Sequence, residues 1–185
     1  MAKTLITGGT VVTATGRSLA DVLIDGETIA AVLAPGSSLL GFDIAANVDT
    51  VIDAAGKYVI PGGVDAHTHM ELPFGGTAAS DTFETGTRAA AWGGTTTIID
   101  FAVQTYGQRV MDGLAAWHAK AEGNCAIDYA FHQIIGDVTD DSLQAMRALP
   151  DEGISSFKLF MAYPGVFMSD DAQIFKAMQV SADTA

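Results

Sequence analysis

Apolar runs recur at a nearly constant interval through the second part of the chain. They begin near residues 64, 95, 126 and 156, and segments with helical periodicity lie between them. Repeating β-α units of this length imply parallel strands joined by right-handed crossovers. A complete (β/α)8 barrel takes roughly 250 residues, so residues 61–185 suffice for about four units. This predicts an α/β fold, either a TIM barrel truncated to about four units or a complete four-unit open sheet. We favour the barrel, with its remaining units beyond Ala185.

Four helices are predicted from capping residues, from apolar residues at helical spacing and from glycine or proline stops. The main signals are a capping box at Asp81-x-x-Glu84 with a stop at Gly93-Gly94, a pattern before Gly123, a pattern ended by Pro150, and a start at Ser169-Asp170-Asp171.

Residues 1–60 have a different pattern, which predicts an all-β segment. Gly8-Gly9 is expected to be a turn between two strands, and Asp25-Gly26 predicts a hairpin because both positions tolerate positive φ. Residues 37–47 have the composition of a loop. We therefore expect two domains, a small β-sandwich segment over residues 1–60 and the N-terminal half of a metal-dependent barrel over residues 61–185. The first of these carries no recognisable site chemistry.

The excess of acidic residues argues against binding partners that carry negative charge. The chain has nine Lys and Arg against 22 Asp and Glu, a net charge of −13. Nucleic acids and anionic membranes both favour a positive surface, so neither is an expected partner. Cys125 is the only cysteine and no apolar run is long enough to span a bilayer. These features predict a cytoplasmic protein without an intrachain disulfide.

Two of the four histidines, His67 and His69, lie two residues apart at the end of the first apolar run. In an extended strand, side chains at i and i+2 point to the same face, so both imidazoles can bind one metal ion. The pair can also be two neighbouring histidines without a ligand. Its context favours a site, because Pro61-Gly62-Gly63 precedes it and a long loop follows it. Such strand ends are where α/β enzymes build their sites.

Lys158 is the only charged residue between Glu152 and Asp170, and its neighbours are apolar or aromatic. An isolated buried ammonium is costly, so this lysine either extends its amine to solvent, loses its proton or is modified. A neutral lysine amine can react with CO₂ to give a carbamate, a carboxylate-like bridging ligand for metals. In a closed barrel, Lys158 and the two histidines could face the same C-terminal mouth.

Three motifs together resemble those of one enzyme family. They are residues 63–77 around the histidine pair, residues 85–101, and residues 156–163 around Lys158. In combination they are similar to motifs of the dihydropyrimidinases and D-hydantoinases, cyclic-amide hydrolases of the amidohydrolase superfamily. The resemblance runs from the N-terminal β segment to the end of the chain, and it corresponds to the N-terminal portion of such an enzyme. It implies a TIM barrel of the amidohydrolase type.

The resemblance also implies a binuclear zinc site, with two Zn²⁺ per full-length subunit. His67 and His69 would bind one ion, and a carboxylated Lys158 would bridge both. Two metal ions would lower the pKa of a shared water and polarise the amide carbonyl of the substrate. The implied reaction opens the ring of a 5,6-dihydropyrimidine or a 5-substituted hydantoin to give an N-carbamoyl amino acid.

Further positions match residues that contact the substrate in the family. Tyr163 matches a tyrosine whose hydroxyl holds the substrate carbonyl and its developing oxyanion. Leu72 and Phe74 match a first hydrophobic gate loop, while Phe160 and Phe167 match a second. The family resemblance also implies a homotetramer or homodimer of the full-length protein, acting on a small cyclic ureide or imide.

Other ligands of the family cannot be placed on this chain. Family members carry two more histidine ligands and a catalytic aspartate on later strands. His118 lies in the second predicted helix and His132 in the third predicted strand, and we interpret both as structural. The proton-shuttling acid/base is therefore absent from these residues. We expect residues 1–185 alone to be inactive and poorly stable, because an unclosed parallel sheet leaves an exposed edge.

Three alternatives from the same superfamily can be weighed from the residues. Dihydroorotases place an arginine shortly after His-x-His, whereas Met70-Glu71-Leu72-Pro73-Phe74 offers no cation. An allantoinase-like cyclic ureide hydrolase remains open, although a polar substituent suits this apolar segment less well. A non-catalytic dihydropyrimidinase-related interaction protein is the third alternative. Such proteins have lost metal ligands, whereas this chain keeps both histidines and the lysine.

Overall fold

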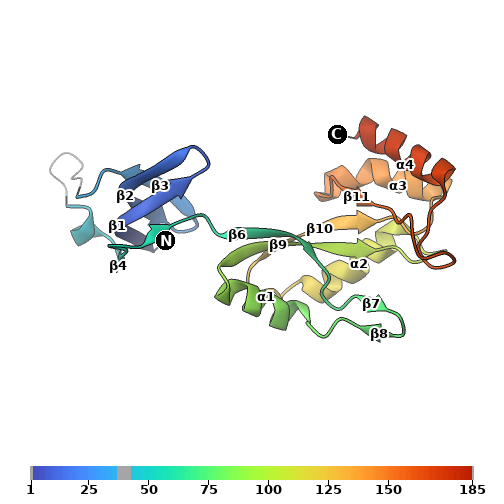
Figure 1. Ribbon diagram of the computed structural model, residues 1–185, viewed down its shortest axis with the longest axis horizontal. Coiled ribbons are helices and arrows are strands. Elements are labelled where there is room, and N and C mark those ends of the chain that lie inside the picture. Colours follow the sequence, from blue (N-terminus) through green and yellow to red (C-terminus); the bar gives the residue numbers. More distant parts are fainter. Residues whose placement is uncertain (1, 37–42, 185) are drawn as a thin grey trace. The chain divides into compact units, whose positions relative to one another are not determined.

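The computed structural model describes residues 2–36 and 43–184, and it divides the chain into two compact units, Met1–Pro61 and Gly62–Ala185 (Figure 1). Each unit has a sheet and a core of its own. Part of the loop predicted over residues 37–47 lies outside the described residues. From residue 43 onward this loop contains a short 3-10 helix, η1 (Ala45–Asn47).

The N-terminal unit is built on one mixed sheet. Its strands are β1 (Lys3–Thr13), β2 (Gly16–Asp25), β3 (Thr28–Leu33), β4 (Thr50–Asp53) and β5 (Tyr58–Val59). The order is β3-β2-β1-β4, and β5 also pairs with β1. The predicted hairpin is confirmed between β2 and β3, where Gly26 in the turn has a φ of +61°.

One prediction for this unit is wrong, and another is not confirmed. Gly8-Gly9 is not a turn, because β1 runs through it with a bulge between Ile6 and Gly9. A Cβ on Gly9 would lie 2.6 Å from Cγ2 of Val59, so the glycine allows close packing there. Residues 2–36 and 43–61 form a single sheet, so the predicted sandwich is not confirmed.

The C-terminal unit has a four-stranded parallel sheet. Its strands are β6 (Gly63–Thr68), β9 (Thr95–Val103), β10 (Asp128–Ile134) and β11 (Phe157–Lys158). They lie in the order β11-β10-β9-β6, and each neighbouring pair is parallel (Figure 1). This confirms the α/β class and the half-barrel sheet predicted from the repeat. In the loop after β6, the chain adds a small hairpin of β7 (Pro73–Phe74) and β8 (Thr77–Ala78).

Four helices accompany these strands. They are α1 (Phe83–Trp92), α2 (Val110–Ala121), α3 (Asp140–Ala148) and α4 (Asp171–Asp183), with a 3-10 turn η2 (Leu149–Glu152) after α3. The stop at Gly93 and the start at Asp170 are confirmed, since Asp170 caps α4. Pro150 lies within η2, so α3 itself ends two residues before it. In the part of the chain that the structure describes, no helix is long and apolar enough to cross a membrane.

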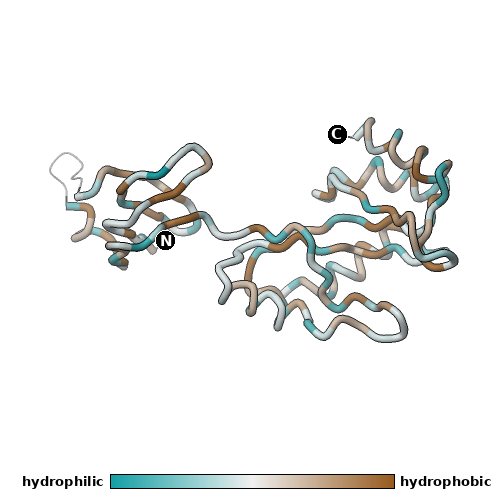
Figure 2. The backbone as a smooth tube through the Cα atoms, in the orientation of Figure 1, coloured by the Kyte–Doolittle hydropathy of each residue, from teal (hydrophilic) through white to brown (hydrophobic). Residues whose placement is uncertain are grey.

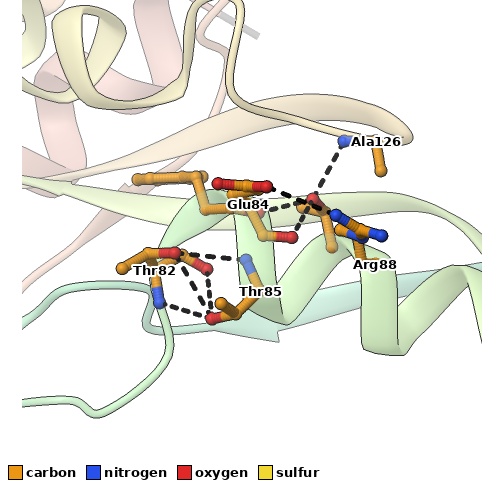
Figure 3. Close-up of polar contacts among 7 residues, drawn as sticks. Thr82, Glu84, Thr85, Arg88 and Ala126 are labelled. Carbon is orange, nitrogen blue, oxygen red and sulfur yellow. Dashed lines mark hydrogen bonds and ion pairs between the residues drawn. The ribbon is translucent and has the colours of Figure 1, made fainter.

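The capping box of α1 lies one residue further along than predicted (Figure 3). The Thr82 hydroxyl accepts from the Thr85 amide at 3.1 Å, and the Thr85 hydroxyl accepts from the Thr82 amide at 3.0 Å. Glu84 instead forms an exposed ion pair with Arg88, at 3.4 Å. Both threonines fit the box because a hydroxyl can accept from a backbone amide as a carboxylate does.

The core of the C-terminal unit lies between the sheet and its helices. Brown, hydrophobic stretches alternate with paler and teal ones along the strands (Figure 2), and the buried hydrophobic residues of β9 and β10, such as Ile98, Phe101 and Phe131, belong to this core. Helices α1 and α2 pack on β9, and α3 packs on α4. Because all four strands are parallel, their carboxyl ends meet at one edge of the sheet, and the candidate site lies at that edge.

Candidate metal centre

His67 and His69 lie at the carboxyl end of β6, and their rings meet edge to face with centroids 5.1 Å apart. Both rings rest on the Phe101 side chain of β9, with centroid distances of 4.6 Å for His67 and 4.9 Å for His69. Phe101 is only 5% exposed. The structure therefore brings the two imidazoles together on one side of the sheet, as the His-x-His spacing predicted.

The backbone that carries this pair is not a regular strand. Asp65 pairs with Ile98 and Thr68 pairs with Asp100, so three steps on β6 face two on β9, and residues 66 and 67 have no partner in the register. This is a β-bulge, a feature that re-aims side chains next to active sites. The Asp65 carboxylate accepts from the His67 amide at 3.1 Å and closes the bulge locally. Simple strand alternation is thus not what brings the rings together.

Asp100 holds the backbone on either side of His69. The sequence did not single it out. Its fully buried carboxylate accepts from the Thr68 hydroxyl and from the Met70 amide, each at 2.8 Å. It also accepts from the Phe101 amide at 2.8 Å and from the indole N–H of Trp117 at 3.3 Å. Thr68 and Met70 flank His69, so one carboxylate fixes the backbone on both sides of that histidine. The available signal was a lone carboxylate inside an apolar strand.

The environment of His69 suits a metal ligand. Burial lowers the pKa of His69, the Lys158 charge lowers it further, and the Asp100 carboxylate partly offsets both effects. Its Nδ1 atom is buried and has no hydrogen-bond partner among the described residues. A buried polar atom without a partner costs free energy, so it calls for an ion or another polar group. A neutral imidazole with a free ring nitrogen is a common metal ligand.

Lys158, in β11, extends its amine over the same aromatic ring. Its Nζ lies 4.2 Å from the Phe101 ring centroid and 4.9 Å from that of Phe160. Burial lowers the pKa of Lys158, which raises the fraction of neutral amine at a given pH. The alternative of an amine that extends into solvent away from the histidines does not fit this placement. Phe101, which the sequence did not single out, is the common neighbour of all three candidate ligands.

A cavity of about 230 Å³ opens beside these ligands. It is lined by His69, Leu72, Phe74, Ile134, Lys158, Phe160, Tyr163 and Phe167. The residues predicted to contact substrate therefore line one space with two of the three predicted metal ligands. Lys158 also lines a second, more open cavity of about 440 Å³, together with His67 and Phe101.

Aromatic contacts form one wall of the smaller cavity. The Tyr163 ring lies 5.3 Å from that of Phe74 and 5.8 Å from that of Phe160, and Phe160 stacks on Phe167 at 5.1 Å. Tyr163 has a positive φ of 66°, uncommon for a bulky residue, and its carbonyl accepts from the amides of the turn that follows. The two predicted gate loops thus meet at Tyr163.

The two other histidines occupy different places. His118, on α2, packs against the rings of Phe131 and Tyr129, as expected of a structural residue. His132, on β10, lies 4.8 Å from the Phe101 ring, so it belongs to the candidate site rather than to the general core. Among residues 2–36 and 43–184, no group of three or more His, Cys, Asp or Glu side chains could hold a metal ion. His67, His69 and Lys158 remain the predicted ligands, and His132 lies beside them on the same Phe101 ring.

Comparison with known proteins places this site in a family. Residues 58–183 match the model of the amidohydrolase family, so the chain belongs to that family. Within it, the chain is 61% identical to a D-hydantoinase of Streptomyces coelicolor over 98% of its own length and 38% of that protein's. This confirms the resemblance found in the sequence motifs.

Solved structures agree with this placement. The chain superposes on a D-hydantoinase with a TM-score of 0.90 and 42% identity, covering 100% of this chain and 38% of that one. It superposes on a dihydropyrimidinase from Brevibacillus agri with a TM-score of 0.88 and 44% identity, covering 98% and 38%. The chain thus spans less than two-fifths of the length of the relatives it matches.

Proposed function

We propose that these residues belong to a cyclic amidohydrolase that opens 5,6-dihydropyrimidines or 5-substituted hydantoins to N-carbamoyl amino acids. The similarity to D-hydantoinases and dihydropyrimidinases supports this reaction. The observation that carries it is the 230 Å³ cavity, in which His69, Lys158 and Tyr163 meet apolar walls. A neutral ring with a hydrophobic substituent fits those walls, and the polar side chains are placed beside them to act on its amide.

Proteins of this family are generally metal-dependent, and the residues of this site fit a metal. His67 and His69 would hold one zinc ion, and a carboxylated Lys158 would bridge it to a second; the pair of ions would supply an activated water and polarise the amide carbonyl. The carbamate forms when the neutral lysine amine attacks the carbon of CO₂ and releases a proton. The lowered pKa of Lys158 favours the neutral amine that this step needs.

The remaining side chains act on the substrate directly. The Tyr163 hydroxyl donates a hydrogen bond to the carbonyl oxygen and stabilises the negative charge that develops there. Leu72, Phe74, Phe160 and Phe167 enclose the ring substituent and exclude bulk water, which strengthens that hydrogen bond. Residues 1–185 alone are expected to be inactive, because the acid/base for the leaving nitrogen is not among the candidate ligands.

Two alternatives are weighed against the same cavity. An allantoinase-like enzyme would need polar walls for a ureido substituent, whereas four of the lining side chains here are Leu or Phe. A non-catalytic interaction protein would have no use for two imidazoles and an amine around Phe101. We further propose a cytoplasmic location and a homotetramer or homodimer for the full-length protein.

The test uses the full native protein, its hydrolysis of dihydrouracil and hydantoin, and its zinc content. Lys158→Ala is expected to lower kcat by about 1,000-fold, equivalent to about 4 kcal/mol of transition-state stabilisation, and to reduce bound zinc. Lys176→Ala is the matched control, since Lys176 is an exposed lysine of α4 that lines neither of the two cavities beside the candidate ligands. Undiminished turnover in Lys158→Ala would overturn the bridging role. A wild-type protein without zinc would favour the interaction protein.

Tyr163→Phe separates the hydroxyl from the aromatic wall. The substitution keeps the ring contacts with Phe74 and Phe160 but removes the donor. We expect kcat to fall about 100-fold with zinc content unchanged. If KM alone rises, the hydroxyl contributes equally to ground-state and transition-state binding.

A further inference from the structure

The backbone of the bulge in β6 is bonded by a side chain from another strand of the sheet. Ala66 and His67 have no partner residue on β9 in the strand register. The carbonyl oxygen of Ala66 lies 3.0 Å from Nε2 of His132, which comes from β10. Because β9 lies between β6 and β10, the imidazole must reach past β9, where it lies 4.8 Å from the Phe101 ring. A side chain of β10 thus bonds the backbone of β6 across β9.

The other nitrogen of His132 binds near the lysine. Its Nδ1 forms a hydrogen bond with the hydroxyl of Ser156, two residues before Lys158. A carbonyl oxygen can only accept, so Nε2 carries the proton of the ring. In the neutral imidazole, Nδ1 then accepts from the Ser156 hydroxyl. One ring therefore joins the residue before His67 to the segment that leads into β11.

The backbone around the histidine pair has few other supports. The Asp65 carboxylate holds the His67 amide, and the Asp100 carboxylate holds the Met70 amide. The Ala66 carbonyl belongs to the same peptide group as the His67 amide, so the bonds to Asp65 and to His132 together set the tilt of the peptide plane that leads into His67. Among the described side chains, His132 is the one seen to bond that carbonyl.

We propose that His132 is a positioning residue for the metal centre. Its bond to the Ala66 carbonyl fixes the bulge that aims His67, and its bond to Ser156 ties that bulge to the strand of Lys158. The inference rests on the proposed function, since it assigns His132 to the same site. It replaces the interpretation of His132 as a structural residue. Hydrogen-bond partners outside the ligand set typically change metal affinity by about 10- to 100-fold.

Three substitutions at one position isolate the bond that matters. His132→Phe keeps a ring on Phe101 and removes both hydrogen bonds. His132→Gln places an amide N–H near the position of Nε2, and His132→Asn reaches only the position of Nδ1. We expect His132→Phe and His132→Asn to weaken zinc binding by about 10- to 100-fold, and His132→Gln to recover most of the loss. His118→Phe, in the same unit, is the matched control and is expected to bind zinc as the wild type does.

The measurement is zinc affinity of the full native protein by competition with a chelator, with urea unfolding as a check on the fold. Equal affinity in His132→Phe and a zinc-binding wild type would overturn the inference and leave the proposed function standing. Equal loss in His132→Gln and His132→Asn would also overturn it, even if His132→Phe fails to fold. A wild-type protein that binds no zinc would overturn the proposed function, and the inference with it.

Discussion

Asp21 in the N-terminal unit and Asp100 in the C-terminal unit are both buried carboxylates, with 6% and 0% of their surface exposed. Asp21 accepts from the amides of Gly8 and Gly36, at 2.8 and 2.9 Å. Both donors belong to glycines with φ of +69°, so this carboxylate fixes the bulge of β1 and the turn at Gly36. Asp100 accepts from four donors, two of which flank His69. A buried carboxylate that accepts hydrogen bonds thus stabilises the fold in one unit and holds the backbone of the candidate site in the other.

This difference teaches that burial of a charge does not identify a functional residue by itself. Each carboxylate is satisfied by hydrogen bonds, as a buried charge must be. What distinguishes Asp100 is the position of its donors next to a candidate ligand, and that position depends on the pairing of β6 with β9. The same substitution at both positions should therefore separate two effects: we expect a change at Asp100 to affect stability and zinc binding, and a change at Asp21 to affect stability alone.

The largest effect is expected from Asp100→Ala. The change leaves the Thr68 hydroxyl, the Met70 and Phe101 amides and the Trp117 indole without their acceptor. Unsatisfied buried donors cost about 1–3 kcal/mol each, partly relieved by relaxation, so we expect a loss of at least about 3 kcal/mol of unfolding free energy. Zinc binding should be lost as well. Urea unfolding and zinc content measure the two effects, and retained zinc would contradict the role given to Asp100.

Replacing one closely packed glycine in each unit by alanine tests how far the surrounding backbone and side chains can move. In Gly113→Ala, the new Cβ would lie 2.5 Å from the Val103 carbonyl oxygen, which is backbone and cannot move aside. In Gly9→Ala, the nearest atom at 2.6 Å is a methyl of Val59, the end of a side chain. We expect losses of about 2–3 kcal/mol for Gly113→Ala and about 1 kcal/mol for Gly9→Ala, measured by urea unfolding. The reverse order would show that α2 yields more easily than the bulge of β1.

Asp21→Ala is expected to have a smaller effect than Asp100→Ala, and one that is confined to stability. Two backbone amides lose their acceptor, for a cost of about 1–2 kcal/mol, and no candidate ligand is adjacent to them. Zinc affinity of the full native protein should remain that of the wild type. A weaker zinc affinity in a well-folded Asp21→Ala protein would break the contrast between the two carboxylates.

Much of this architecture could be predicted because its signals are local. Apolar runs near residues 64, 95, 126 and 156 correspond to four parallel strands, and Asp170 caps the helix that it was expected to begin. The candidate ligands were recognisable by residue type and context, since a lone lysine among aromatic residues has few structural uses. Each of these signals is carried by a short stretch of sequence and can be recognised without knowing which distant segments pair.

The missed features depend on pairing between distant segments. The bulge at residues 66 and 67 exists only in the register of β6 against β9, and the role of Phe101 follows from that register. In the sequence, His132 is one residue within a predicted strand, and its contact with the Ala66 carbonyl is seen only in the folded chain. The predicted sandwich is not confirmed for a related reason, because strand signals show that a sheet forms but not whether a second sheet faces it.

The smallest expected effect is on the alkylation rate of Cys125, whose pKa depends on the charge of Asp100. Cys125 is partly buried beside the core. Burial raises the pKa of the Cys125 thiol, and the Asp100 charge raises it further. The thiolate is the nucleophile, so alkylation by iodoacetamide at pH 8 should be slower than for a free thiol. Asp100→Asn removes the charge, lowers the pKa of Cys125 and should speed alkylation by a few-fold. Asp21→Asn should leave the rate unchanged. Equal acceleration in both variants would point to a loosened fold instead of a lost charge, and mass spectrometry of the modified protein distinguishes these outcomes.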